Sequence, residues 1–160
     1  MKLLARTCLA GSVFVLGGAA RVLAADPFYM GSDVSLLPYI ESRGGVCHDG
    51  GQVRPMEQSL VNHGDNLFRL RLFVNPDPVY DHTSGAIQDL NYTIGLAQRL
   101  KATGAKILLD FHYSDTWADP GKQTKPAAWA GHSYSQLKTD VYNHTYDVLN
   151  ALKSQGTTAD

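Results

Sequence analysis

Four polar side chains with the chemistry of a ligand site fall in two pairs within apolar segments of the sequence. Arg69 and Arg71 stand two residues apart, and so do Asp110 and His112. Residues two apart in an extended chain share one face, so each pair presents its side chains together. Guanidinium, carboxylate and imidazole groups donate and accept the hydrogen bonds that polar ligands need. The pairs predict a polar ligand site; a solvated arginine face and a structural Asp–His pair are the alternatives.

The segment that follows His112 adds aromatic and acidic side chains. It runs from Tyr113 to about His132 and contains Asp115, Trp117, Asp119 and Trp129. Loops of this length are usually functional or disordered. Aromatic rings pack on the C–H face of a sugar while polar groups take its hydroxyls, so this composition favours a carbohydrate ligand. A metal site with His112 and Asp115 as ligands is the alternative.

Hydrophobic periodicity and turn residues predict that strands and helices alternate along the chain. The predicted strands are residues 28–34, 66–74 and 105–112. The predicted helices are residues 55–62, a segment from Leu90 to Gly104, and a segment from Ser133 to Gln155. Ser133 and Gln136 form a capping-box pattern at the start of the last helix. Residues 44–51 are predicted to be loop.

The order of these elements predicts an α/β fold with a parallel sheet. Gly64, Gly104 and Gly156 each end a predicted helix, where glycine tolerates the left-handed conformation. Three strand–helix units match the leading part of a (β/α)8 barrel, which typically has about 250 residues. The chain reaches Asp160 where a fourth strand is expected to begin. A flavodoxin-like sheet is the rival, but residues 42–45 lack the glycine-rich phosphate fingerprint that it needs. In either fold, ligands bind beyond the carboxyl ends of the strands.

Composition and the N-terminal segment limit the classes of protein to which this chain can belong. The chain has 160 residues and a formal net charge of −1, which argues against general nucleic-acid binding. Residues 1–25 have a basic start, a short apolar run and small residues before Asp26, which predicts a secretory signal peptide and an exported protein. A membrane anchor is the alternative, but the apolar run is shorter than the ~20 residues that span a bilayer. Residues 26–160 retain one cysteine, Cys47, and therefore cannot close an internal disulfide.

Several of these segments resemble one enzyme family. Residues 109–123 and 125–129 resemble the third-strand signature of glycoside hydrolase family 53, the secreted endo-β-1,4-galactanases that act on type I arabinogalactan. Residues 69–76 resemble the second-strand motif of the same family. The segments 31–35 and 141–149 resemble its first strand and third helix. The likeness covers residues 28–160, of which residues 110–129 are the most specific part.

The resemblance implies a (β/α)8 barrel and a retaining glycosidase, in which two carboxylates lie ~5–5.5 Å apart. In the family both are glutamates that follow strands four and seven, so this chain contains no catalytic residue. The resemblance implies that Arg69 and Arg71 orient the nucleophilic glutamate, and that His112 and Asp115 bond sugar or catalytic groups. Trp117 would stack near the point of cleavage. Asn75 and Asp119 complete the predicted substrate-binding set, whereas Phe73 replaces the tryptophan usual in the family.

The expected partner is galactan polysaccharide or oligosaccharide, with no cofactor, no metal and a monomeric full-length protein. Two other classes remain open at this stage: a non-catalytic carbohydrate-binding piece and a metal-dependent barrel hydrolase. The missing strands are also expected to leave apolar side chains without neighbours; these are Leu70, Leu72, Ile107 and Leu109. Because a folded domain is stable by only ~5–15 kcal/mol, residues 26–160 alone are expected to lack a cooperative thermal transition.

Overall fold

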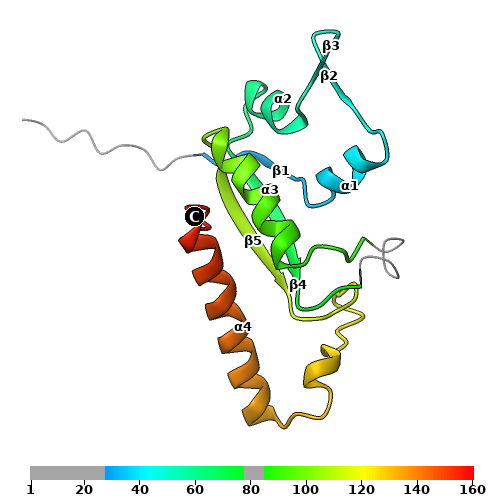
Figure 1. Ribbon diagram of the computed structural model, residues 1–160, viewed down its shortest axis with the longest axis vertical. Helices are drawn as coiled ribbons and strands as arrows, with labels where there is room; N and C mark the ends of the chain where they lie inside the picture. The colour runs from blue at the N-terminus through cyan, green and yellow to red at the C-terminus, as the bar shows by residue number, and fades with distance from the viewer. Residues whose placement is uncertain (1–27, 78–84) are drawn as a thin grey trace, which may run out of the picture.

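The computed structural model describes residues 28–77 and 85–160. The predicted signal peptide, residues 1–25, lies outside this range. Three parallel strands form the main sheet in the order β1-β4-β5: β1 (Gly31–Asp33), β4 (Leu67–Phe73) and β5 (Lys106–His112). Strand β4 lies in the middle, beside β5 along its whole length (Figure 1). The predicted strands are therefore confirmed, although β1 is shorter than expected.

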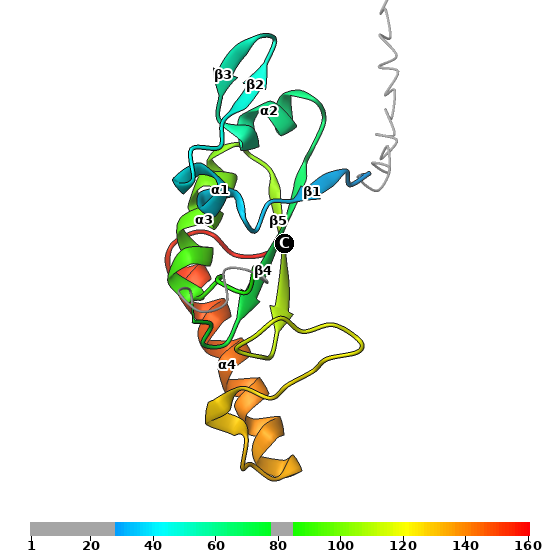
Figure 2. The ribbon, with the colours of Figure 1, turned by 90° about the vertical axis from the view of Figure 1, so that its right-hand side faces the viewer.

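Two long helices cover one face of this sheet (Figure 2). These are α3 (Leu90–Ala102) and α4 (Tyr134–Ser154). Apolar residues alternate along β4 and β5 and point toward the helices, where Phe68, Leu70 and Ile107 are fully buried. The predicted capping box is present, because the Ser133 side chain accepts from the Gln136 backbone N–H and the Gln136 side chain accepts in return. The α/β architecture thus follows from the strand and helix periodicities.

The opposite face of the sheet carries the polar residues. Cα partners in register place Asp33 beside Arg69, and Arg71 beside Asp110. The one long apolar side chain of β5 on this face, Leu108, is 47% exposed. The expectation that Leu70, Leu72, Ile107 and Leu109 lack neighbours is wrong, because all four pack on the helix side of the sheet. Leu108 is instead the residue that a closed barrel would cover.

The chain end lies beside the start of β5. The backbone N–H of Asp160 donates to the Ile107 carbonyl at 3.0 Å, and the Ile107 N–H donates to Oδ2 of Asp160 at 3.0 Å. The Lys106 N–H donates to the Asn66 carbonyl on the β4 side. The backbone N–H and carbonyl of the next residue, Ile107, therefore point away from β4 and are free to pair with another segment. A further parallel strand would pair at this edge. The fourth strand itself stays a prediction.

The connection from β1 to β4 differs from its prediction. It contains a short helix α1 (Leu37–Ser42), a hairpin of β2 (Cys47–Asp49) and β3 (Gln52–Arg54), and then α2 (Met56–Asn62). The loop predicted for residues 44–51 is thus partly a hairpin. Gly50 and Gly51 form its two-residue turn with φ of +59° and +78°, the conformation that matches the twist of paired strands. Cys47 lies on β2, half-buried and free.

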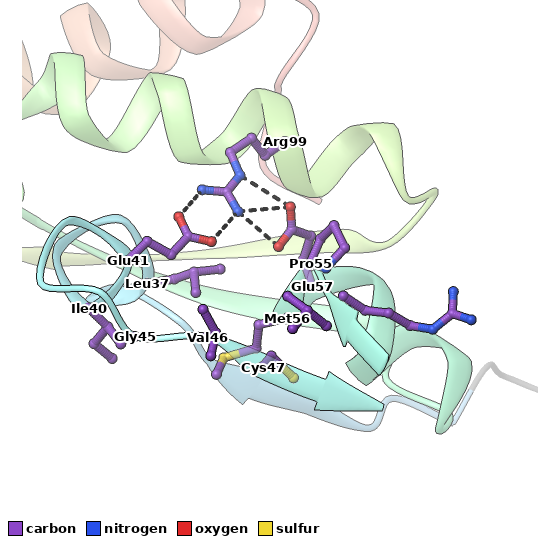
Figure 3. A pocket seen from close by; sticks show the side chains of 12 residues that line it. Leu37, Ile40, Glu41, Gly45, Val46, Cys47, Pro55, Met56, Glu57 and Arg99 are labelled. Carbon is purple, nitrogen blue, oxygen red and sulfur yellow. Dashed lines mark hydrogen bonds and ion pairs between the residues drawn. The ribbon is translucent and has the colours of Figure 1, made fainter. Parts of the chain in front are cut away.

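Arg99 of α3 ties this connection to the helical layer (Figure 3). Its Nη1 donates to Glu41 Oε2 at 2.6 Å, and its Nη2 donates to Glu57 Oε1 at 2.9 Å. Hydrogen bonds from Arg99 hold the pKa of Glu41 below its ordinary value, against the smaller opposing effect of burial. The Glu57 side chain is only 10% exposed, so Arg99 compensates a carboxylate that water scarcely reaches. One guanidinium therefore joins α1, α2 and α3.

Replacing Arg99 with methionine should lower the free energy of unfolding by about 2 kcal/mol. Methionine keeps the apolar stem but leaves Glu57 buried and unpaired; the one-third exposure of Arg99 keeps the loss below that of a fully buried pair. Urea denaturation of the full-length protein measures the change. Arg54→Met, on exposed β3, is the matched control and should shift stability by no more than about 0.5 kcal/mol. Equal midpoints for the two variants would contradict this account of Arg99.

Within the described residues, no helix combines the length and the apolar character needed to cross a bilayer.

Candidate functional site

Arg69 joins two carboxylates at the carboxyl end of the sheet. Its Nη1 contacts Oδ2 of Asp33 on β1, and its Nη2 contacts Oδ2 of Asp110 on β5. The central position of β4 explains this arrangement, because Arg69 reaches a neighbour on either side. Its side chain remains 41% exposed on the face that carries no helix. One cation is thus held between two acids, with part of its surface open to a further partner.

Asp33 is the most strongly held of these acids. Its Oδ1 accepts from the backbone N–H and the hydroxyl of Ser35, at 3.0 and 2.6 Å, and its Oδ2 accepts from Arg71 Nε at 3.0 Å. Burial alone would raise the pKa of Asp33, but the hydrogen bonds from Ser35 and Arg71 outweigh burial and lower it. The residue is therefore an anion that fixes both arginines. The set of site residues predicted from the sequence omits Asp33. Its position at the end of the first predicted strand could have identified it as a site residue.

His112 lies at the end of β5, packed between aromatic rings. Its Nε2 is 2.9 Å from Asp110 Oδ2, and its ring centroid is 4.7 Å from that of Phe73 and 5.8 Å from that of Trp117. The side chain is 11% exposed. Its Nδ1 is buried and has no hydrogen-bond partner within residues 28–77 and 85–160. Asp110 and His112 thus share a face, as their spacing predicts.

Trp117 packs against Arg71. The Arg71 guanidinium carbon lies 5.0 Å from the indole centroid, and the Arg71 side chain is 14% exposed. A cation so placed over an indole face is attracted by the quadrupole of the ring. Trp117 is half-buried, so Arg71 and His112 fix the ring and leave part of it open. The structure therefore brings four of the predicted residues together: Arg69, Arg71, His112 and Trp117.

Asp115 holds two loops to one another. Its Oδ1 accepts from the Asn75 backbone N–H at 3.0 Å, and its Oδ2 accepts from the Ala127 backbone N–H at 2.8 Å. The first amide follows β4, whereas the second begins the short 3-10 helix Ala127–Trp129. Both carboxylate oxygens therefore bond the backbone, and the geometry indicates that Asp115 positions the loop. Asn75 supplies one of the amides.

Replacing Asp115 with alanine should leave both amides without this acceptor and lower the free energy of unfolding by about 1–3 kcal/mol. The loss should be concentrated in residues 113–132, whose amide hydrogen exchange should accelerate. Asp119→Ala is the matched control, since Oδ1 of Asp119 accepts one amide, that of Gly121, in an exposed turn. A smaller loss for Asp115→Ala than for Asp119→Ala would contradict the role assigned to Asp115.

Asp119 comes after Asp115 and Trp117 in the loop that follows β5. Its backbone N–H and carbonyl pair with Lys122 at 2.9 and 3.0 Å, which closes a tight turn. Together with Asp110, His112 and Gln123 it lines a hollow of about 320 Å³ at the end of β5. A larger hollow of about 490 Å³ lies among α1, the hairpin and α2 (Figure 3). That larger hollow is lined by none of the predicted site residues.

No group of three or more histidine, cysteine or acidic side chains able to hold a metal ion occurs among the residues that the structure describes. His112 is hydrogen-bonded to Asp110, and Asp115 accepts from two backbone amides.

The parallel sheet, its helices and the polar residues at the carboxyl ends of the strands match the leading three β/α units of a (β/α)8 barrel. The model of glycosyl hydrolase family 53 matches residues 29–160, and the chain belongs to that family. The fold class predicted from the sequence, and the family resemblance, are both confirmed.

Named relatives and solved structures agree with this assignment. The chain is 39% identical over 135 residues to the probable arabinogalactan endo-beta-1,4-galactanase A of Aspergillus fumigatus, covering 83% of this chain and 36% of the relative. It is 39% identical over 130 residues to the arabinogalactan endo-beta-1,4-galactanase of Thermothelomyces thermophilus, covering 80% and 36%. The Ignisphaera aggregans GH53 catalytic domain superposes with a TM-score of 0.75 at 39% identity, covering 82% of this chain and 37% of that domain. The chain thus spans little more than a third of these relatives.

Proposed function

We propose that this chain is the N-terminal part of a secreted, retaining endo-β-1,4-galactanase that hydrolyses β-1,4-galactosidic bonds in type I arabinogalactan. The observation that carries the proposal is the Asp33–Arg69–Asp110 cluster at the strand ends of a family 53 chain. Ligands of such barrels bind at that end. The names of the relatives support galactan as the substrate. Residues 1–25 are proposed to direct secretion, and the whole enzyme to act as a monomer without a cofactor.

In this proposal two glutamates beyond residue 160 perform the chemistry. One protonates the leaving glycosidic oxygen, and the other attacks the anomeric carbon to form a glycosyl-enzyme that water then hydrolyses. The open side of Arg69 faces the nucleophile and favours its ionised form, as a cation beside a carboxylate does. Asp33 and Asp110 fix the guanidinium, so its position is set before substrate arrives. The chain therefore contributes positioning and binding to the reaction.

The remaining predicted residues are proposed to bind the sugar or to shape its site. Trp117 stacks on a galactose C–H face, backed by Arg71. His112 lines the hollow beside β5 and bonds a hydroxyl or a catalytic carboxylate there. Asp119 borders the hollow beside β5, and Asn75 and Asp115 hold the surrounding loops.

The test is the action of the intact protein on purified β-1,4-galactan, with linear arabinan and cellulose as control polysaccharides. Short galactooligosaccharides should appear from galactan alone, and proton NMR of the first products should show the β-anomer before mutarotation. Products of α-configuration would overturn the retaining mechanism. Release of sugars from arabinan or cellulose but not from galactan would overturn the substrate assignment.

A further inference from the structure

A histidine outside the strand-end site lies against three aromatic rings. His144 projects from α4, and its ring meets those of Phe111, Tyr113 and Trp129 nearly edge-on, at centroid distances of 6.2, 6.1 and 6.0 Å and interplanar angles of 80°, 73° and 74°. The three rings belong to β5, to the loop after it and to the 3-10 helix. His144 thus touches both ends of residues 113–129. That segment carries Asp115, Trp117 and Asp119.

The cluster lies behind the strand-end site. Phe111 alternates with Asp110 and His112 along β5, so it points to the helix-covered face. Tyr113 is held twice by α4, since its hydroxyl also lies 2.8 Å from Thr145 Oγ1. Thr145 donates in turn to the Val141 carbonyl, which leaves its oxygen free to accept from Tyr113.

The environment of His144 favours an uncharged ring. Its Nε2 is buried and finds no hydrogen-bond partner in the described parts of the chain. Burial lowers the pKa of His144, and the opposing attraction of Asp147, on the same helix, is the smaller effect. Among the described residues, the side chains that meet the ring from β5, the loop and the 3-10 helix are Phe111, Tyr113 and Trp129, none of which is a carboxylate. The Tyr113 phenol, which is bonded to Thr145, is the one titratable group of the three. Protonation would place a charge among apolar rings.

We propose that His144 is a positioning residue whose uncharged ring seats Tyr113 and Trp129 and thereby orders the 113–129 loop over the strand ends, and that its protonation loosens this loop. Asp115 carries the effect toward the site, because it bonds Ala127 beside Trp129 and Asn75 beyond β4. The link to substrate rests on the proposed galactanase function; the ordering of the loop does not.

The sign of the pH dependence follows from proton linkage. A histidine in the unfolded chain titrates near pH 6.5, and the folded protein binds that proton less readily. The contribution of neutral His144 to stability is therefore complete above about pH 6.5 and is lost as the pH falls through and below that value. Three other histidines each lie within hydrogen-bond distance of a carboxylate: His63 beside Asp49 at 3.0 Å, His112 beside Asp110 at 2.9 Å and His132 beside Asp140 at 2.6 Å. These pairs are the same in the wild type and in a variant at His144, so the comparison of the two isolates the contribution of His144.

The experiment compares the intact wild-type protein with His144→Phe, which keeps an aromatic ring and never carries a charge. The melting temperature of the wild type should fall relative to that of His144→Phe by about 2 °C or more between pH 7 and pH 5. His48→Phe, on the exposed hairpin, is the control and should run parallel to the wild type. In the wild type alone, amide exchange in residues 113–129, corrected for intrinsic rates, should lose protection by about threefold or more over the same range.

Parallel melting curves for the wild type and His144→Phe, or unchanged loop protection in the wild type, would overturn the proposal. If His144→Phe fails to fold, the exchange measurement decides, since it needs no variant. Both readouts are independent of substrate, so a protein that degrades no galactan but loosens its loop would contradict only the proposed function. The link between loop and substrate has its own test in an active galactanase. If kcat/KM falls equally toward acid pH in the wild type and in a folded His144→Phe, that link is contradicted.

Discussion

Replacing Arg69 with methionine in the intact enzyme is expected to lower kcat/KM on β-1,4-galactan by about 10²–10³-fold, the loss typical of removing one preorganised electrostatic group. Methionine fills similar volume but leaves Asp33 and Asp110 facing each other without the cation that separates them. The nucleophile proposed to lie against the open side of Arg69 would lose its positive neighbour. Initial rates of reducing-sugar release across galactan concentrations measure the effect.

Two further variants separate catalysis from folding. Arg69→Lys keeps the positive charge, but its ammonium group cannot bond both carboxylates as the planar guanidinium does. This variant should therefore recover only part of the lost activity. Arg43→Met, at the exposed C-terminal end of α1, removes an arginine that packs over the Tyr39 ring rather than in the strand-end cluster, and should retain wild-type kinetics. An Arg69→Met protein that melts at a lower temperature but keeps near-normal kcat/KM would show that the cluster is structural only.

The second large effect concerns the isolated stretch 26–160, which should release no sugar from galactan above the buffer background. The described part of this stretch supplies the Asp33–Arg69–Asp110 cluster, but no described glutamate lies in that cluster; Glu41 and Glu57 bond Arg99 in the helical layer. The stretch should also unfold without a cooperative thermal transition. Leu108 is 47% exposed on the face that other barrel strands would cover, and among the described residues Asp160 alone pairs with the free edge of β5.

The matched control is the same protein expressed with the continuation of its reading frame, where an Asn-Glu pair is expected within about ten residues of Asp160 on the family pattern of strand four. That longer protein should melt cooperatively and degrade galactan. Turnover by residues 26–160 alone, or a sharp calorimetric transition in that stretch, would show that the leading three units are self-sufficient.

Sequence periodicity was enough to predict the strands and helices that have strong local patterns. The alternation in β4, the apolar run of β5 and the capping box at Ser133 each depend on neighbouring residues. The β2–β3 hairpin was missed because its strands are three residues long and contain no buried residue, so no apolar alternation marks them; the Gly50–Gly51 turn was the usable signal. The short helix α1 was missed as well.

The site was predictable in its faces but not in its contacts. Spacing alone placed Arg69 with Arg71 and Asp110 with His112. That Arg69 bridges Asp33 and Asp110 depends on the register of three strands separated by long connections, which no local pattern encodes. The bonds from Asp115 to Asn75 and Ala127 likewise depend on loop closure. The side of the sheet that holds Leu70 and Ile107 became clear only once the helices were in place.

The most direct test of the account is a crystal structure of the intact protein with β-1,4-galactobiose, the smallest product expected. The account predicts a galactose ring stacked on Trp117. That ring should lie within hydrogen-bond reach of His112 or of the carboxylate proposed to lie against the open side of Arg69. Galactobiose bound elsewhere with the strand ends empty, for example in the hollow among α1, the hairpin and α2, would contradict the claim that the strand ends bind galactan.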